Sequence, residues 1–399
     1  MKLPALVVAL CAATAAAAFR VDLPSVQSQE YRNQSLKRAK VFVSEPHITA
    51  DLSVSDTGPG SFKPDDLVEC DWDFTQRATA TTRKFYCAVR SPGPRTGAAD
   101  VIKVKYSRDS INPHEEVFTT VLASRLMKVL GFASNRYFLV RRLRCYGCTA
   151  DPYKDARHMS GLSRYQLVRK NFVPDGNGQY APDYSKFTDF TYVSILRKVG
   201  TEIQSYRHQG LGYDELSKID VTSGATAAQI DAFRLLAVFM NHSDNHSSNQ
   251  ALVCLEKKKD IVTELGDDLG RTSACENPVV EIKDAGVTFG TGYGLFSPYR
   301  GLALNEWQKA KIWKNDNDCT VDIQGIRGNS FHSVRISEAG RQEFAARLNT
   351  LSRQRVSDLF NGIDLSRLPF RGHPEYNDVG AWVQVFFDKA QAINNKRCK

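Results

Sequence analysis

Two short stretches decide the fold that we expect for this chain: residues 239–249 read FMNHSDNHSSN, and residues 280–286 read VEIKDAG. In the first stretch an aspartate, Asp244, is followed five residues later by Asn249. The second stretch ends in an Asp-x-Gly motif that begins at Asp284. The rest of the sequence is interpreted around this order, Asp-x4-Asn and then Asp-x-Gly.

The residues around these motifs predict the elements that carry them. A capping box from Thr226 to Gln229 opens a helix with one apolar stripe, formed by Ile230, Phe233, Leu236, Ala237 and Met240. A short apolar run, residues 251–255, follows the Asp-x4-Asn loop, and an alternating run, residues 279–282, leads to the Asp-x-Gly. We therefore expect helix, loop, strand, strand and Asp-x-Gly in that order.

The three polar residues have the types that phosphoryl transfer requires. In kinase-type enzymes an Asp accepts the proton of the substrate hydroxyl, and an Asn five residues later binds a metal ion. The Asp of an Asp-x-Gly binds the metal ions that bridge the nucleotide phosphates. Asp244 fits the role of the base, and Asn249 and Asp284 supply the hard oxygen ligands that Mg²⁺ prefers. A polar loop with helix-capping side chains would explain the first stretch alone equally well.

Two alternatives compete with this interpretation. Asp268 also begins an Asp-x-Gly, but it lies in a polar segment flanked by two cysteines, so we prefer Asp284 as the metal ligand. His242 and His246, four residues apart, would suit Zn²⁺ if they lay on a helix. No carboxylate or third histidine is placed in the sequence to complete such a zinc site.

A strand and a helix upstream supply the expected phosphate-binding pair. Residues 101–106 alternate as a strand, which places Lys103 and Lys105 on the same face. The predicted helix that follows holds Glu116 in its first turn and stops at Gly131. A strand lysine and a helix glutamate form the ion pair that positions nucleotide phosphates in kinases. The alternative is a surface lysine with a first-turn glutamate favoured by the helix dipole.

Two further strands are predicted over residues 68–74 and 84–89. A kinase would cover the nucleotide phosphates with the loop between these strands, but residues 76–83 contain no glycine-rich sequence. The candidate phosphate contacts in this loop are therefore polar side chains, namely Thr79, Thr81, Thr82 and Arg83.

The N-terminus predicts export from the cell. Residues 1–2 form a short basic region, residues 3–13 are apolar, and residues 15–18 are four alanines suited to cleavage. We interpret residues 1–18 as a secretory signal peptide, because the apolar region is too short to cross a bilayer. No later stretch is long and apolar enough to do so, and we expect a secreted or periplasmic protein.

The cysteine content agrees with an oxidising compartment. Of the nine cysteines, Cys11 leaves with the signal peptide, and the even number that remains predicts up to four disulfides. Cys145 and Cys148 form a Cys-x-x-Cys, for which a local disulfide is favoured over a redox motif or half of a zinc site. The other expected pairs are Cys70–Cys87, Cys254–Cys275 and, by elimination, Cys319–Cys398.

The composition and net charge indicate which classes of partner to expect. A hydrophobic content of 42% over 399 residues is ample for a core, in one large two-lobed domain or in two domains. The net charge of +9 favours anionic partners such as phosphates or acidic lipids. The basic residues are spread along the chain and form no aromatic-interleaved basic motif, so nucleic acid is not expected as a partner.

The sequence resembles the HipA-type and phosphatidylinositol-kinase-like fold in residues 103–106, 116–118, 122–132, 244–249 and 284–286. The span from about residue 66 to residue 360 resembles more closely a group of uncharacterised exported bacterial proteins of that kinase-like fold. The shared features include the Cys-x-Gly-Cys at Cys145 and a Thr-Phe-Gly that follows the Asp-x-Gly.

The resemblance implies roles for individual residues. Lys105, or Lys103, would contact phosphates, and Glu116 would hold the lysine. Asp244 would be the catalytic base, while Asn249 and Asp284 would hold Mg²⁺ or Mn²⁺ for bound ATP. The chain departs from the family in its phosphate loop, which is not recognisable.

We therefore expect an α+β, two-lobed kinase-like fold. A weakly ordered lead-in, residues 19–60, would precede a β-rich N-lobe with one helix, residues 61–148, and a mostly helical C-lobe, residues 149–399. The expected function is exported ATP- and metal-dependent transfer of a phosphoryl group to a hydroxyl of a protein, glycan or lipid. The alternative is a secreted pseudokinase-like binding protein, which the scarcity of ATP outside cells favours.

Overall fold

The computed structural model describes residues 29–46, 60–76, 82–90, 100–107, 115–158, 166–167, 169–175, 180–205, 210–255, 274–290, 301–315, 317–323, 331–368 and 374–399. Within these ranges the chain mixes helices and sheets, as the sequence predicts. The expected signal peptide, the competing Asp268 and two candidate phosphate contacts, Thr79 and Thr81, lie outside the described residues.

Five strands close into a barrel in the order β1-β2-β3-β7-β4. Neighbouring strands are antiparallel except for β1 and β4, which pair in parallel. Alternate side chains point inward and fill the barrel with an apolar cluster that includes Val68, Phe85, Val104 and Ile195. The strands are β1 (Leu67–Trp72), β2 (Lys84–Val89), β3 (Val101–Lys105), β4 (Arg136–Tyr146) and β7 (Phe187–Arg197).

Strand β7 closes the barrel, because it pairs with both β3 and β4. It lies well beyond residue 148, where the β-rich part was expected to end. The expected boundary at residue 148 therefore falls between two strands of one sheet. Without β7, the facing edges of β3 and β4 would be left unpaired, which explains why a distant segment joins this sheet.

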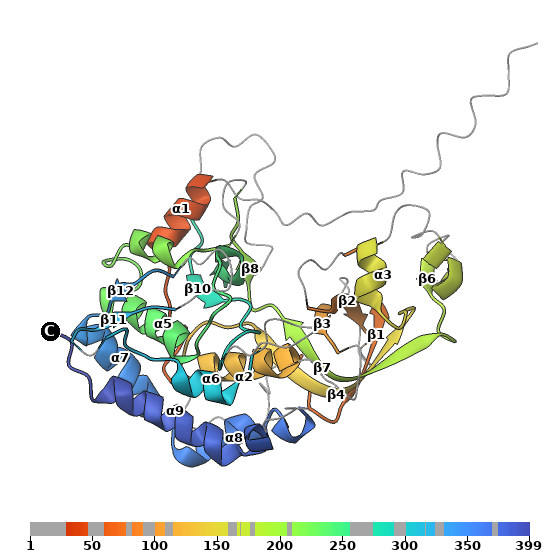
Figure 1. Cartoon of the computed structure of the whole chain (residues 1–399). Helices are drawn as coiled ribbons and strands as arrows, with labels where there is room; N and C mark the ends of the chain where they lie inside the picture. The colour runs from red at the N-terminus through yellow and green to blue at the C-terminus, as the bar shows by residue number, and fades with distance from the viewer. Residues whose placement is uncertain are drawn as a thin grey trace, which may run out of the picture.

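Helix α2 (Glu115–Val129) lies against the outer face of the barrel and contacts β4 and β7. Figure 1 shows it between the barrel strands and the C-terminal helices. All of its residues except Lys128 are buried. Just after it, Gly131 adopts a φ of +83°, and an added Cβ would lie 2.3 Å from the Ser44 carbonyl oxygen. Only glycine fits there, so the helix ends where the sequence predicts.

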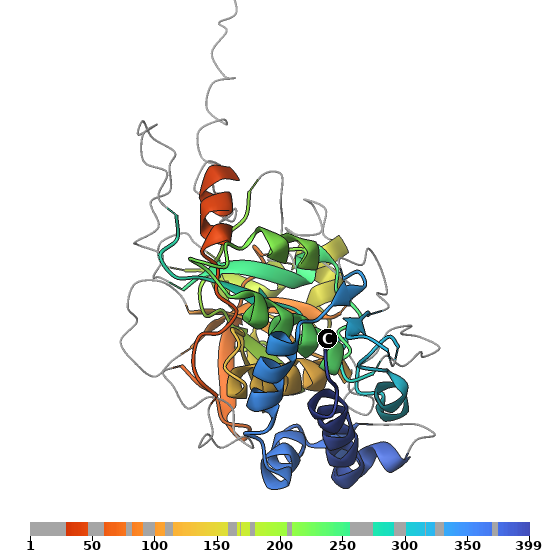
Figure 2. The same ribbon diagram turned by 90° about the vertical axis from the view of Figure 1, so that its left-hand side faces the viewer.

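The C-terminal half of the chain is mostly helical. Helix α5 (Ala227–Phe239) packs against α7 (Glu338–Leu348), and α9 (Val379–Asn394) packs against α7 and α8 (Arg353–Asn361). Figure 2 shows these C-terminal helices gathered below α5. None of the helices in the described part of the chain combines the length and apolar composition needed to cross a bilayer.

A three-stranded sheet in the order β10-β9-β8 carries the second motif. Its strands are β8 (Thr201–Glu202), β9 (Gln250–Cys254) and β10 (Pro278–Ile282). The remaining short elements are α3 (Pro152–His158), β5 (Phe172–Pro174), β6 (Tyr180–Pro182), α6 (Leu304–Lys309), β11 (Thr320–Val321), β12 (Val334–Arg335), and the 3-10 helices η1 (Tyr213–Lys218), η2 (Ser247–Asn249), η4 (Leu365–Arg367) and η5 (Pro374–Asn377).

Part of the segment that we expected to be weakly ordered is instead folded. Residues 29–37 form helix α1, and Arg32 is buried with both terminal nitrogens 3.0 Å from the carboxylate oxygens of Glu215. Just beyond the helix, the backbone of Lys40 exchanges hydrogen bonds with β10. No apolar stripe predicts this helix, because a buried ion pair and backbone pairing anchor it.

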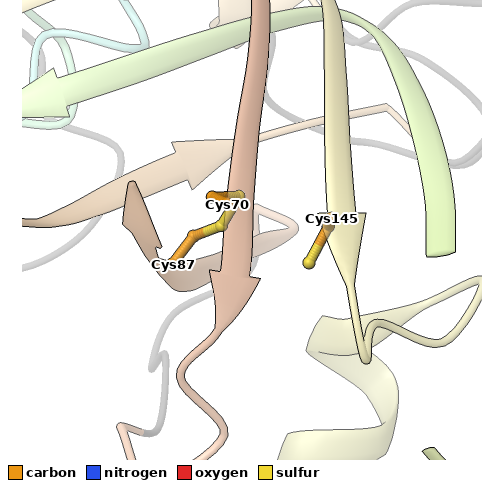
Figure 3. Close-up of side chains that lie close together, drawn as sticks. All are labelled: Cys70, Cys87 and Cys145. Carbon is orange, nitrogen blue, oxygen red and sulfur yellow. A yellow bond between two sulfur atoms is a disulfide. The ribbon is translucent and has the colours of Figure 1, made fainter. Parts of the chain in front are cut away.

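The four expected disulfides are present: Cys70–Cys87, Cys145–Cys148, Cys254–Cys275 and Cys319–Cys398. The first two lie side by side, because Cys70 on β1 is the direct partner of Cys145 on β4. Figure 3 shows the side chains of Cys70, Cys87 and Cys145 on adjacent strands. Their sulfur atoms lie within 4.8 Å of one another. These sulfurs are bonded in disulfides and are not thiolates free to bind a metal.

Candidate functional site

The loop that holds the first motif starts at the end of α5. The Thr226 hydroxyl caps the start of this helix by accepting from the Gln229 backbone nitrogen, and the Gln229 side-chain oxygen accepts from the Thr226 backbone nitrogen, as the capping box predicts. The helix ends at Phe239, and two residues later Asn241 adopts a left-handed φ of +50°. Asparagine tolerates this conformation better than most residues, and it turns the chain out of the helix into the loop.

His242 fastens this loop to the second motif. Its Nε2 lies 3.2 Å from the backbone oxygen of Asp284, and its Nδ1 lies 3.3 Å from the hydroxyl of Tyr213. Because a carbonyl oxygen only accepts, Nε2 carries the proton, and Nδ1 accepts from the tyrosine. Burial lowers the pKa of His242 to about 4, so the ring is neutral at physiological pH. The structure gives His242 a positioning contact and does not place it on a helix with His246, as a zinc pair would require.

Asn249 lies directly beside the Asp-x-Gly. Its backbone oxygen accepts hydrogen bonds from the backbone nitrogens of Lys283, at 2.8 Å, and Asp284, at 3.2 Å. Its side-chain nitrogen donates to the backbone oxygen of Asp244 at 2.7 Å. Since that acceptor fixes which end of the amide is nitrogen, the side-chain oxygen remains available for another partner.

Lys105 on β3 joins the barrel to the second motif. Its Nζ lies 2.8 Å from Oδ1 of Asp284 and 3.9 Å from Oε2 of Glu116 on α2. It also lies 3.2 Å from the hydroxyl of Thr120. Burial opposes the charge on Lys105, but Asp284 and Glu116 more than offset it and raise the pKa of the lysine. The expected approach of Glu116 to one of the two lysines is confirmed, and the lysine is Lys105.

Glu116 has a second partner in Thr82, whose hydroxyl donates to the same carboxylate oxygen, Oε2. Thr82 lies just before β2, in the loop that the sequence proposed for phosphate contacts. The backbone nitrogen of Gly286 lies 3.3 Å from Oδ1 of Asp284, and a Cβ at this glycine would lie 3.0 Å from Oε2 of Glu116. The glycine of the Asp-x-Gly therefore lets α2 approach the motif closely.

Two further lysines surround Asp284. Lys84 on β2 is the direct cross-strand partner of Lys105, and Lys103 lies two residues away on the same face of β3. Burial strongly lowers the pKa of Lys103, to about 7, and also lowers that of Lys84. Burial acts against ionisation of Asp284, but the charges of Lys105, Lys84 and Lys103 hold its pKa well below the usual range. The carboxylate is ionised at any physiological pH.

Asp244 differs from Asp284 in its electrostatic surroundings. Burial, the neighbouring charge of Asp284 and that of Glu116 raise the pKa of Asp244, against the opposing effect of His246 and Asn249. Oδ1 of Asp244 lies 3.3 Å from Nε2 of His246. Two carboxylates of one site thus have pKa values pushed in opposite directions, an arrangement that separates an acid–base group from a permanently charged one.

The structure brings the predicted site residues to one region, between the barrel strand β3, helix α2, the loop after α5 and the end of β10. Lys105, Glu116 and Asp284 are in direct contact, and Asn249 links Asp284 to Asp244 through its backbone and side chain. Lys103 adds charge to the site but forms no hydrogen bond or ion pair with any described residue.

Sequence reasoning missed Lys84 and the positioning contact of His242. Lys84 begins a predicted strand, but nothing in the local sequence says that its neighbour across the sheet is Lys105. Arg83, one of the proposed phosphate contacts, pairs instead with Asp151 at 3.1 Å.

No family model and no curated protein matches this chain in sequence. Among solved structures, the chain is similar to the crystal structure of the Helicobacter pylori proinflammatory kinase CtkA. The sequence identity is 9%, the TM-score is 0.40, and the match covers 83% of this chain and 100% of that chain. A likeness this remote carries no argument about the site, and membership of the HipA-type family stays a prediction.

Proposed function

We propose that this chain is a kinase-like phosphotransferase that binds ATP with a divalent metal ion and transfers the γ-phosphoryl group to a hydroxyl. The observation that carries the proposal is the position of Lys105, which contacts Asp284 and Glu116 together. A lysine held between a helix glutamate and the Asp of an Asp-x-Gly is the arrangement that kinases use to hold nucleotide phosphates. In the proposed arrangement the barrel and α2 form one lobe and the helical half forms the other.

Asn249 and Asp284 have the chemistry of a site for Mg²⁺ or Mn²⁺. Asp284 stays ionised, and the side-chain amide of Asn249 is turned so that its oxygen is available. Hard cations of this kind bind few protein oxygens and complete their shell with water and phosphate. A bound metal ion would neutralise charge on the phosphates, and Lys105 of β3 would contact the same groups.

Asp244 would accept the proton of the acceptor hydroxyl. A general base must be close to its substrate and have a pKa nearer to the working pH than a free carboxylate. The pKa of Asp244 is raised, which brings it nearer to the working pH than that of a free carboxylate. The side-chain nitrogen of Asn249 donates to the backbone oxygen of Asp244, so the base and the metal ligand keep a fixed position relative to each other.

The acceptor would be a protein, glycan or lipid outside the cytoplasm, since we also propose that the chain is exported. The disulfides at Cys70–Cys87 and Cys254–Cys275, among the others, support an oxidising compartment.

Titration of the purified protein with ATP and MgCl₂ tests the proposal. A ligand at a hundred times its Kd adds about 2.7 kcal/mol to the free energy of unfolding, which a thermal shift detects. We expect stabilisation by ATP with Mg²⁺ in the wild type and in Lys309→Met, an exposed lysine of α6, and none in Lys105→Met. No stabilisation of the wild type would overturn nucleotide binding.

A second candidate function is nucleotide or partner binding without catalysis. It is favoured by the fact that Oδ1 of Asp284 already contacts both Lys105 and the backbone nitrogen of Gly286. That oxygen would have to change partners to bind a metal ion. ATP binding without transfer of labelled γ-phosphate to the protein, to added hydroxyl acceptors or to water would support this second function.

A further inference from the structure

Lys84 occupies a position that the proposed function does not yet explain. It is the first residue of β2, and in the register of the sheet it lies opposite Lys105. Its neighbour Phe85 packs in the barrel interior, so the side chain of Lys84 projects from the outer face, where Lys105 and Glu116 also meet. The charge of Lys84 acts on Asp284 and Lys105, which places it within the same cluster.

Lys84 is a buried residue, and its side chain has no matching partner among the described residues. Only 6% of the residue is exposed, and no hydrogen bond or ion pair joins its side chain to any residue in the described ranges. Taking an ammonium group out of water is costly unless it is paired and hydrogen-bonded. A buried lysine that has no partner among the described residues and lies beside a candidate ligand site is therefore suited to bind an anionic ligand.

The lysines of the cluster are unequally paired. Three lysines, Lys84, Lys103 and Lys105, act on Asp284, and Glu116 and Asp244 are further carboxylates of the site. Lys105 alone contacts both Asp284 and Glu116. An anion with several negative charges would compensate Lys84 and Lys103, and a chain of phosphates is such an anion.

The sequence of the loop between β1 and β2 explains why two lysines would be needed to bind phosphates here. Residues 73–83 contain no glycine, so the sequence lacks the flexible backbone with which kinases wrap the phosphates. Two side-chain ammonium groups on adjacent strands supply positive charge at the same end of the barrel. They do so without requiring the backbone to approach the ligand closely.

We infer that Lys84 is a second phosphate-binding lysine and that, with Lys105, it takes the place of the missing glycine-rich loop. The inference rests on the proposed function and adds to it that the ligand carries at least two linked phosphates, one for each lysine. Lys84 contacts phosphate oxygens, whereas Lys105 also remains tied to α2 through Glu116.

Calorimetric titration of Lys84→Met with ATP, ADP and AMP, each with Mg²⁺, tests this inference. A hydrogen bond to a charged group is worth enough to change affinity by about tenfold to a hundredfold. We expect a loss of that size for ATP and ADP and a much smaller loss for AMP. Lys84→Arg, which keeps the charge, should recover part of the affinity, and the exposed-site control Lys309→Met should bind as the wild type does.

Unfolding in urea separates ligand binding from a structural role. Because Lys84 is a buried lysine without a partner in the described part of the chain, methionine should leave the stability of the ligand-free protein unchanged or increase it. Destabilisation by Lys84→Met, or equal losses for ATP and AMP, would overturn the inference. Unchanged ATP affinity would also overturn it while leaving the proposed function intact, whereas a wild type that binds neither ATP nor ADP would overturn both.

Discussion

Nζ of Lys105 lies 2.8 Å from Oδ1 of Asp284 but 3.9 Å from Oε2 of Glu116, so the lysine is bonded more closely to the Asp-x-Gly than to helix α2. Thr82 donates to the glutamate oxygen that faces the lysine. The three charged groups are largely buried, which makes their mutual attraction strong and the removal of any one of them costly. This contact holds the barrel against the helical half of the chain.

Replacing Lys105 with methionine should destabilise the protein. It leaves Asp284 and Glu116 close together without the cation between them, and breaking a buried ion pair costs about 3–5 kcal/mol. Urea unfolding at pH 7 measures this loss, with Lys309→Met as the exposed-lysine control. A change below about 1 kcal/mol would show that Lys84 and Lys103 compensate for the missing charge.

The matched variants Asp284→Asn and Asp244→Asn should differ in the step that they affect. Asp284→Asn removes the ionised metal ligand, so the Mg²⁺-dependent part of ATP binding should disappear. Asp244→Asn should bind ATP and Mg²⁺ normally but transfer phosphate about 10²–10⁴-fold more slowly, the usual contribution of a general base. Calorimetry and release of labelled phosphate measure the two steps, and a loss of binding in Asp244→Asn would contradict its assignment as the base.

Glu281 on β10 should make the stability depend on pH. It is 2% exposed, and its Oε1 accepts a hydrogen bond from Asn135 at 2.8 Å, while Oε2 has no partner among the described residues. Burial first, and then the charge of Glu202, raise its pKa from 4.5 to about 7, against the opposing effects of Lys283 and Asn135. The folded protein therefore holds a proton that the unfolded chain releases at lower pH.

Because the folded pKa is the higher one, the stabilisation is complete below pH 4.5 and is lost as the pH rises to about 7. A shift of this size corresponds to about 3 kcal/mol. Glu281→Gln should remove this loss, so the variant should gain stability relative to the wild type between pH 4.5 and 7. Urea unfolding at several pH values measures the difference, and Glu306→Gln, a half-exposed carboxylate on α6, is the control. Parallel pH curves for the wild type and Glu281→Gln would refute this assignment.

The parts of the fold that depend on local sequence could be predicted. Strand β2 has the predicted bounds of residues 84–89, and α5 starts after the predicted cap at Thr226. The approach of Glu116 to a lysine of the preceding strand could also be predicted, from the pattern of a strand lysine followed by a first-turn helix glutamate.

Features that depend on contacts between distant segments could not be predicted. Strand β7 inserts between β3 and β4, a position that its own alternation of polar and apolar residues does not specify. Lys84 has the sequence of an ordinary strand residue, and its burial follows from segments that are far away in the chain. Helix α1 is held by the pair of Arg32 with Glu215, which no pattern within residues 29–37 reveals.

The four disulfides should stabilise the chain unequally. In the chain-entropy model a disulfide stabilises by restricting the unfolded chain, and the effect grows with the length of the loop that it closes. Cys319–Cys398 spans 79 residues and Cys145–Cys148 spans 3. For loops of these lengths the model gives about 4.5 and about 1.6 kcal/mol, respectively.

Paired substitution of both cysteines by alanine removes the same side-chain volume in each case, so the loop length remains the principal difference between the two variants. Cys319→Ala/Cys398→Ala should lower the free energy of unfolding by about 3 kcal/mol more than Cys145→Ala/Cys148→Ala does. Urea unfolding under non-reducing conditions measures both losses. A larger loss for the short loop would show that the packing of Cys145 against Cys70 and Cys87 inside the barrel matters more than the restriction of the unfolded chain. The chain-entropy account would then be wrong for this protein, and the two adjacent disulfides would act as part of the barrel core.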